Sequence, residues 1–123
     1  MTDLTIEATE ETPKISFKQN ENEFIISERS LPENAVEFYT PIFDWIEKYK
    51  NNPNSETIFD FKLDYFNTAS AKQITKLLLM LEDIEKLKNV KIRWFFKKGD
   101  LDMQSSGLRY DKLIDVEFEI LEY

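Results

Sequence analysis

The segment LDYFNTASAK, residues 63–72, brings Asn67, Thr68 and Ser70 together where a strand-like pattern gives way to a helical one. Amide and hydroxyl oxygens of this kind cap a helix, because they accept hydrogen bonds from the free N–H groups of its first turn. A hydroxyl at a helix start can also carry a phosphate, whose charge the positive end of the helix dipole stabilises. The segment therefore predicts a helix cap, a phosphorylation site at Thr68, or both, and Ser70 is the second candidate for phosphorylation.

The chain contains few candidate residues for catalysis. Among its 123 residues there is no histidine, no cysteine and only two glycines. This composition removes the commonest general base, thiolate chemistry, the usual transition-metal ligands and every glycine-rich phosphate loop. The carboxylate pairs Glu10–Glu11 and Asp100–Asp102 lie in acid-rich segments typical of solvated surface. We therefore expect a protein that is not an enzyme and has neither cofactor nor metal site.

Charge and hydropathy limit the partners and the location. The net charge of −8 opposes binding to nucleic acid, since such a chain repels a phosphate backbone. No apolar run approaches the roughly 20 residues of a membrane-spanning helix. The acidic start MTDLTIEATEE lacks the basic and apolar regions of a signal peptide. We expect one domain, residues 1–123, located in the cytoplasm without membrane insertion.

Alternation of apolar and polar residues with a period of two predicts the strands. It occurs in Leu4–Ala8, in a hairpin over Lys14–Ser27, and in Phe59–Tyr65, Val90–Phe96 and Val116–Ile120. Strands buried on both faces consist of continuous apolar runs, whereas alternation leaves one face of a sheet in water. All helices should then cover the other face. The predicted fold class is α/β, a two-layer sandwich of a mixed β-sheet with helices packed on one face.

The first helix follows the segment SLPEN. Ser30 and Glu33 have the spacing of a capping box, and Pro32 is expected in the first turn. Pro41 lies inside the helical pattern and predicts a kink or a local break. A short third helix is expected within Ser105–Ile114. The apolar stripe of the first helix comprises Ala35, Phe38, Tyr39, Ile42, Trp45, Ile46 and Tyr49.

The second helix is expected from Thr68 to about Lys88, with a buried stripe of Ile74, Leu77, Leu78, Leu81 and Ile84. At 100° per residue, the side opposite this stripe presents Thr68, Lys72, Thr75 and Leu79. The core does not account for Leu79, although single exposed leucines are common. A hydroxyl and an apolar residue on one exposed side indicate a docking face that a phosphate could switch.

Three segments together resemble the SiaC family of bacterial regulatory phosphoproteins. They are IEATEETPKISF (residues 6–17), RSLPENAVEFYTPIFDWIEKY (residues 29–49) and LDYFNTASAK, and they follow one another along nearly the whole chain. The resemblance lies in the Thr-Pro start of the hairpin, the Ser-x-Pro-Glu-Asn helix opening and the Asp-Tyr-Phe-Asn-Thr junction. Glu28 departs from the pattern, since the family leads us to expect a glycine before Arg29 and Ser30.

The resemblance implies a fold like that of the anti-sigma-factor antagonists (STAS-like) and a cycle of partner switching. A Ser/Thr protein kinase would phosphorylate Thr68, and a metal-dependent phosphatase of the PPM type would remove the phosphate. The unphosphorylated protein would bind and activate a GGDEF-type diguanylate cyclase, raising cyclic di-GMP and promoting aggregation or biofilm. The expected partner-binding residues are Asp64, Tyr65, Asn67, Lys72, Thr75 and Leu79.

Two other functions stay open on the sequence. The same fold could bind an anti-sigma factor, which would make the protein an anti-sigma-factor antagonist that controls transcription. Alternatively, Asp60, Lys62 and Asp64 alternate on one strand and face together on the open side of the sheet, where they could bind a small ligand or a metal ion. Pairing of charges across strands explains the same three residues.

Overall fold

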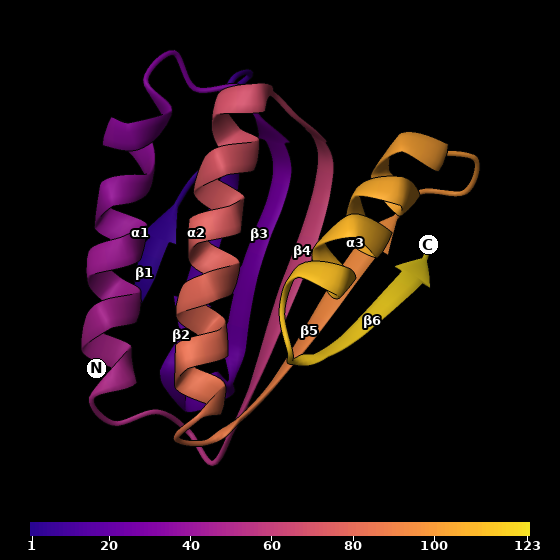
Figure 1. Cartoon of the computed structure of the whole chain (residues 1–123). Helices are drawn as coiled ribbons and strands as arrows, with labels where there is room; N and C mark the ends of the chain where they lie inside the picture. Colours follow the sequence, from indigo (N-terminus) through magenta and orange to yellow (C-terminus); the bar gives the residue numbers. More distant parts are fainter.

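The computed structural model describes residues 1–123 and contains one sheet of six strands covered by three helices (Figure 1). The spatial order of the strands follows the sequence. Neighbours among the first three strands are antiparallel, and those from the third to the sixth are parallel. The strands are β1 (Leu4–Ile6), β2 (Lys14–Lys18), β3 (Glu23–Ser30), β4 (Glu56–Phe66), β5 (Asn89–Phe96) and β6 (Glu117–Glu122).

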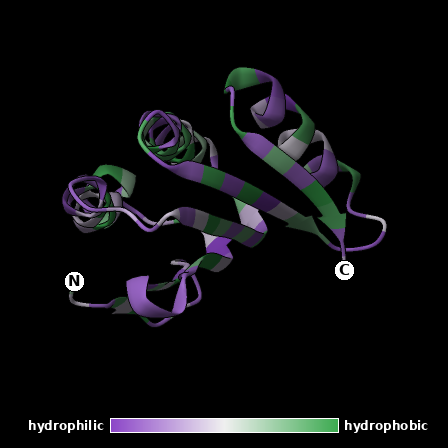
Figure 2. Ribbon diagram, turned by 90° about the horizontal axis from the view of Figure 1, so that it is seen from below, coloured by the Kyte–Doolittle hydropathy of each residue, from purple (hydrophilic) through white to green (hydrophobic).

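Each parallel connection crosses through one helix. The helices are α1 (Ala35–Lys50), α2 (Thr68–Glu85) and α3 (Leu101–Leu113). Such connections are right-handed, and here each one steps to the next strand in the same direction, so all three helices lie on one face. Figure 2, viewed along a perpendicular direction, shows the helices on one side of the sheet. The predicted two-layer fold class is confirmed. No helix has the length and hydropathy that crossing a membrane requires.

The core lies between the sheet and the helices. All members of the predicted α2 stripe are 0% exposed, and every member of the α1 stripe except the half-buried Phe38 is buried. The strands contribute aromatic and aliphatic side chains at alternate positions, as predicted. The largest of these buried strand residues are Phe17, Phe24, Phe59, Phe61 and Trp94.

The opposite face of the sheet carries ion pairs. Asp60 accepts two hydrogen bonds from Arg93, from Nε at 2.6 Å and from Nη2 at 2.7 Å. Lys97 Nζ lies 2.9 Å from Asp64, and Lys91 pairs with two glutamates of β6. Cross-strand charge pairing therefore describes this face, and it engages both aspartates that the sequence offered as ligands.

The start of α1 differs from the prediction. The helix begins at Ala35, and Asn34 is its cap, since Asn34 Oδ1 accepts a hydrogen bond from the N–H of Glu37 at 3.1 Å. Ser30 ends β3 and is completely buried, so it cannot cap a helix that begins five residues later. The capping box of Ser30 with Glu33 was therefore wrong, and Pro32 lies before the helix instead of in its first turn.

Two further helix predictions need correction. The helix α1 continues through Pro41, so the local break, one of the two outcomes predicted there, does not occur. Pro41 is exposed, so water can reach the carbonyl of Glu37, to which Pro41 can donate no N–H. The helix α3 begins at Leu101, earlier than expected, because Asp100 Oδ1 caps it by accepting from Met103 N at 3.0 Å.

A bulge changes the end of β4. The partners of Glu28 and Arg29 on β4 are Leu63 and Tyr65, so Asp64 is an extra residue in that strand. Glu28 itself has φ of 75°, in the left-handed region that favours glycine. Simple alternation would have turned Tyr65 toward the core together with Leu63. Instead the bulge leaves Tyr65 52% exposed.

Candidate functional site

The first turn of α2 separates the capping residue from the modifiable one. Asn67 Oδ1 accepts a hydrogen bond from Ser70 N at 2.9 Å, and Asn67 N donates to the carbonyl of Ser30 at 3.1 Å. Thr68 is the first residue of the helix, is exposed, and makes no side-chain hydrogen bond. The cap therefore does not use the Thr68 hydroxyl, which faces solvent.

Ser70 has a different environment. It is 0% exposed, and its hydroxyl donates to the carbonyl oxygen of Ser30 at 3.0 Å and accepts from the Ser30 hydroxyl at 2.8 Å. The Ser30 hydroxyl lies 2.7 Å from that of Tyr39, and because Ser30 already donates its proton to Ser70, the tyrosine is the donor of that pair. Burial raises the pKa of Tyr39 to about 12, although its hydrogen bonds oppose the rise. This network joins the starts of α1 and α2 to the end of β3 and leaves a kinase no access to Ser70.

The outward side of α2 agrees with the prediction at three of four positions. Thr68, Lys72 and Leu79 are exposed, Leu79 by 44%. Thr75 is half-buried because it turns toward α3, and its hydroxyl donates to the carbonyl of Ala71 at 3.0 Å. The hydroxyl of Tyr110 donates to the same carbonyl at 3.2 Å. Thr75 thus belongs to the contact between α2 and α3 and not to the exposed side of α2.

A cleft of about 340 Å³ lies between the end of β4, the start of α2 and the helix α3. It brings together four of the residues predicted from the sequence: Asp64, Tyr65, Asn67 and Thr68. The opposite wall depends on how α3 packs, so spacing along the sequence did not indicate it; the Asp100–Asp102 pair had been interpreted only as solvated surface. The residues of this wall are Asp100, Asp102, Met103, Ser106 and Arg109.

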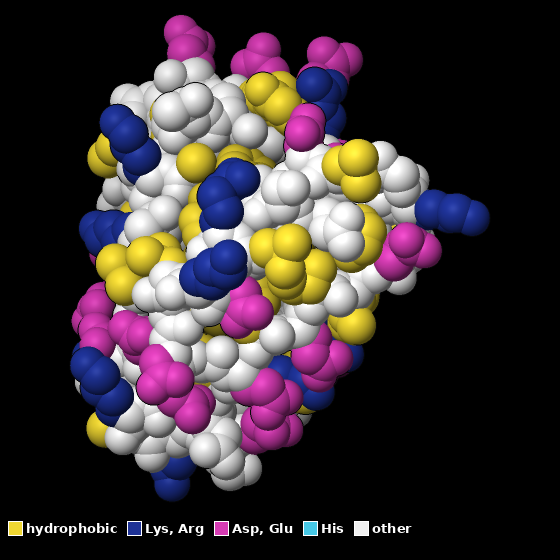
Figure 3. Space-filling view, turned by 45° about the vertical axis from the view of Figure 1, so that its right-hand side comes forward, with side chains coloured by type: hydrophobic (Ala, Val, Ile, Leu, Met, Phe, Trp, Pro, Cys, Tyr) yellow, Lys and Arg dark blue, Asp and Glu magenta, His cyan; other side chains and the backbone are white.

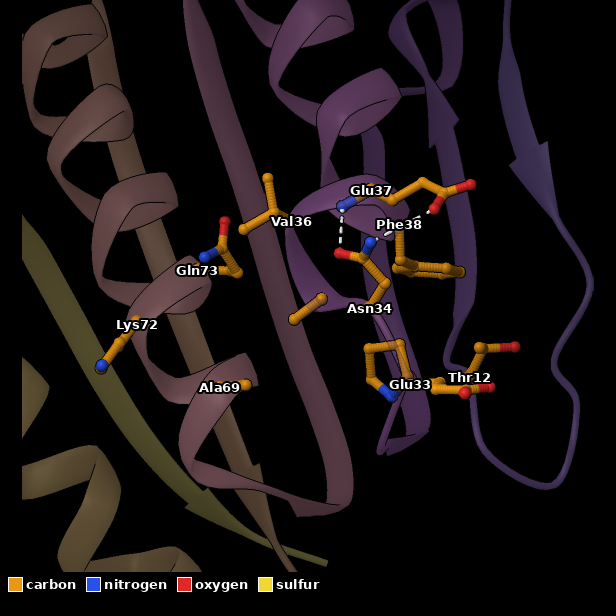
Figure 4. A pocket seen from close by; sticks show the side chains of 11 residues that line it. Thr12, Glu33, Asn34, Val36, Glu37, Phe38, Ala69, Lys72 and Gln73 are labelled. Atoms are coloured by element: carbon orange, nitrogen blue, oxygen red, sulfur yellow. Dashed lines mark hydrogen bonds between the residues drawn. The ribbon is translucent and has the colours of Figure 1, made fainter.

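A second groove, of about 900 Å³, separates the starts of α1 and α2 (Figure 4). Val36 and Gln73 lie between the two helices, whereas the side chain of Lys72 points away from α1 (Figure 4). Val36 is 65% exposed, so this groove has an apolar wall open to solvent. Lys72 lies four residues after Thr68 in α2, so the two residues are neighbours on the same side of the helix.

The charged residues in the first half of α2 are all basic. The helix carries Lys72 and Lys76 in its first half, and its first acidic residue is Glu82. Figure 3 shows basic side chains among apolar patches on this face, with acidic side chains in its lower half and also along its upper edge. A phosphate on Thr68 would have Lys72 one turn further along its own helix. The carboxylates near it would be Asp64 on the same wall of the cleft and Asp100 and Asp102 on the opposite wall.

A family match and two solved structures agree on one family. The family described as "SiaC family regulatory phosphoprotein" matches residues 6–123. One similar solved structure is SiaC of Pseudomonas aeruginosa, with a TM-score of 0.89 and 25% identity over 100% of both chains. Its apo form has a TM-score of 0.89 and 25% identity, and the match covers 98% of this chain and 99% of that one.

A third structure is that of the diguanylate cyclase SiaD in complex with its activator SiaC from the same organism. It has a TM-score of 0.91 and 24% identity, and the match covers 98% of this chain and 100% of that one. An uncharacterized protein of P. aeruginosa strain UCBPP-PA14 is 29% identical over 99 residues, which are 80% of this chain and 79% of that protein.

Proposed function

The chain belongs to the SiaC family of regulatory phosphoproteins, and we propose that it is a non-catalytic switch protein whose unphosphorylated form binds and activates a diguanylate cyclase. The output is a higher level of cyclic di-GMP, which promotes aggregation or biofilm. The SiaC of P. aeruginosa is the activator of the cyclase SiaD and forms a complex with it. The common fold and the family membership support the same kind of partner for this chain, and the proposal locates the protein in the cytoplasm.

The switch in this proposal is phosphorylation of Thr68. A Ser/Thr kinase transfers the γ-phosphoryl group of ATP to Thr68 Oγ1, and the hydroxyl proton leaves; a PPM-type phosphatase returns the hydroxyl by hydrolysis. The observation that carries the proposal is the exposed, unbonded hydroxyl of Thr68 beside the separate cap Asn67. A phosphate can be added there without removing a hydrogen bond of the fold, whereas Ser70 is sealed in the buried network.

The docking face is assigned to the exposed side chains around this hydroxyl. Tyr65 and Leu79 supply apolar surface at 52% and 44% exposure, and Lys72 supplies charge. Asp64 and Asn67 border the cleft, and Thr75 contributes at most its edge. A phosphate adds about −1.5 to −2 charges in the middle of this face, so it weakens docking through desolvation and altered complementarity.

Calorimetry against the diguanylate cyclase of the same organism tests the proposal. Thr68→Ala should bind as tightly as the unmodified protein and stay competent in the presence of kinase and ATP. Phosphothreonine at position 68 should weaken binding by tenfold or more, about 1.4 kcal/mol. Thr40→Ala is the matched control, since Thr40 is an exposed threonine of α1. Equal cyclase affinities of the phosphorylated and unmodified proteins would refute the switch. Capture of an anti-sigma factor in place of the cyclase would identify the alternative output, transcription.

A further inference from the structure

Arg109 of α3 lies across the cleft from Thr68 and has no carboxylate partner. Both residues line the same cleft of about 340 Å³. Arg109 is exposed, and the one side-chain hydrogen bond of its guanidinium runs from Nη2 to the Ser106 hydroxyl at 3.1 Å. The neighbouring Tyr110 contacts the carbonyl of Ala71, three residues after Thr68. The packing of α3 thus holds a free cation beside the first turn of α2.

The carboxylates of the cleft are mostly engaged elsewhere. Asp64 is paired with Lys97 at 2.9 Å, and Asp100 accepts the capping hydrogen bond from Met103 N. Asp102, in the first turn of α3, has no ion pair. A dianionic group in this cleft is therefore attracted by Arg109 and opposed chiefly by Asp102.

We propose that Arg109 receives the phosphate carried by Thr68, so that phosphorylation joins α2 to α3 and occupies the cleft beside Tyr65. The inference rests on the proposed phosphorylation of Thr68 and adds the residue that reads it. An arginine suits this role because its planar guanidinium can donate two hydrogen bonds to one phosphate. In the phosphorylated state the bridge covers the apolar wall that Tyr65 offers to a partner, and loss of docking follows from this covering as well as from charge.

The test uses the full chain with phosphothreonine incorporated at position 68 during synthesis, so that no kinase is needed. Phosphorus NMR measures the second pKa of the phosphate, which lies near 6 when unperturbed. A guanidinium in contact favours the dianion, so this pKa should be lower in the parent phosphoprotein than in Arg109→Gln by about one unit. Asp102→Asn should lower it further, and Lys112→Gln, an exposed lysine outside the cleft, should leave it unchanged.

Each outcome decides the inference. A pKa that rises in Arg109→Gln and is restored in part by Arg109→Lys supports it, provided that tryptophan fluorescence shows both variants folded. A pKa that responds to Lys72→Gln and not to Arg109→Gln overturns it, since the phosphate then faces outward along α2.

Cyclase affinity is measured on the same samples. If phosphorylation weakens binding while Arg109→Gln leaves the pKa unchanged, the inference fails and the proposed function stands. If phosphorylation leaves cyclase affinity unchanged, the proposed function fails whichever residue meets the phosphate.

Discussion

Neighbouring polar residues at the start of α2 have separate structural roles. Asn67 supplies the capping oxygen, Thr68 presents an unbonded hydroxyl to solvent, and Ser70 is buried in a network with Ser30 and Tyr39. The cost of substitution should therefore differ sharply among them. Removing a helix cap costs about 1 kcal/mol, whereas an exposed hydroxyl without a partner contributes almost nothing to stability. This division allows Thr68 to be modified while the helix start stays intact.

The buried tyrosine of this network should make stability depend on alkaline pH. Tyr39 is neutral when protonated, and burial raises its pKa from 10.0 to about 12 in the folded state. Its contribution is complete below pH 10 and is lost as the pH rises from 10 toward 12, by about 2–3 kcal/mol. Urea unfolding between about pH 9 and about pH 12 should show a steeper decline for the parent than for Tyr39→Phe. Parallel declines of the two proteins would contradict the assignment, because the other tyrosines and the lysines are common to both.

The bulge between β3 and β4 is the local feature that directs the site. It inserts Asp64 into β4, turns Tyr65 outward, and leaves Phe66 to pack edge-on against Trp94 at 6.1 Å between ring centroids. Opposite the inserted residue, Glu28 adopts φ of 75°. The glycine that the family resemblance leads us to expect at this position would adopt that backbone without strain. The departure from the family pattern thus falls on a position where the backbone conformation is costly for glutamate.

Glu28→Gly should stabilise the protein. Relief of the left-handed strain contributes about 1 kcal/mol, reduced by the greater freedom of glycine in the unfolded chain. The urea midpoint, followed by the fluorescence of the two tryptophans, should rise. Glu28→Ala keeps the Cβ and serves as the control, with no gain expected. A gain of equal size in the alanine variant would assign the effect to the lost charge of Glu28 and not to the backbone.

The two faces of the sheet separate stability from docking. The helices cover one face and carry every residue of the proposed switch except those at the end of β4 (Figure 1). The other face of the sheet is not covered by helices and carries ion pairs. The pair of Asp60 with Arg93 is the most buried of them, since the Asp60 side chain is 8% exposed. A substitution on this face at a distance from Asp64, which borders the cleft, should therefore alter stability without altering recognition.

Asp60→Asn tests this separation. It removes the charge that Arg93 pairs with, and the expected loss of stability is about 1–2 kcal/mol, since Arg93 remains partly hydrated. Cyclase affinity measured by calorimetry should be unchanged. Titration of the parent with calcium or nucleotides should leave the tryptophan fluorescence constant, since both oxygens of Asp60 are engaged by Arg93. A saturable response that Asp60→Asn abolishes would instead support the ligand-binding alternative.

Much of the architecture is predictable from periodicity. Alternation located the strands and indicated one wet face, and the stripe from Ile74 to Ile84 defined α2 together with its exposed side. These patterns are predictive because a strand repeats every two residues and a helix every 3.6, so burial is recorded locally in the order of residues. Thr68 at the start of α2 followed from the same local information.

Features that join distant segments required the folded chain. Ser30 matched a capping box, yet it ends β3 and its hydroxyl bonds to Ser70, 40 residues further along the chain, while Asn34 caps α1. The bulge that exposes Tyr65 arises from the pairing of β3 with β4. Arg109 meets the cleft because α3 packs on Trp94, where the Cβ-free Gly107 permits close approach. The sequence alone thus indicated where a phosphate could be added. Packing between elements determined which side chains surround that position, because contacts between distant segments depend on how the elements are placed and not on spacing along the sequence.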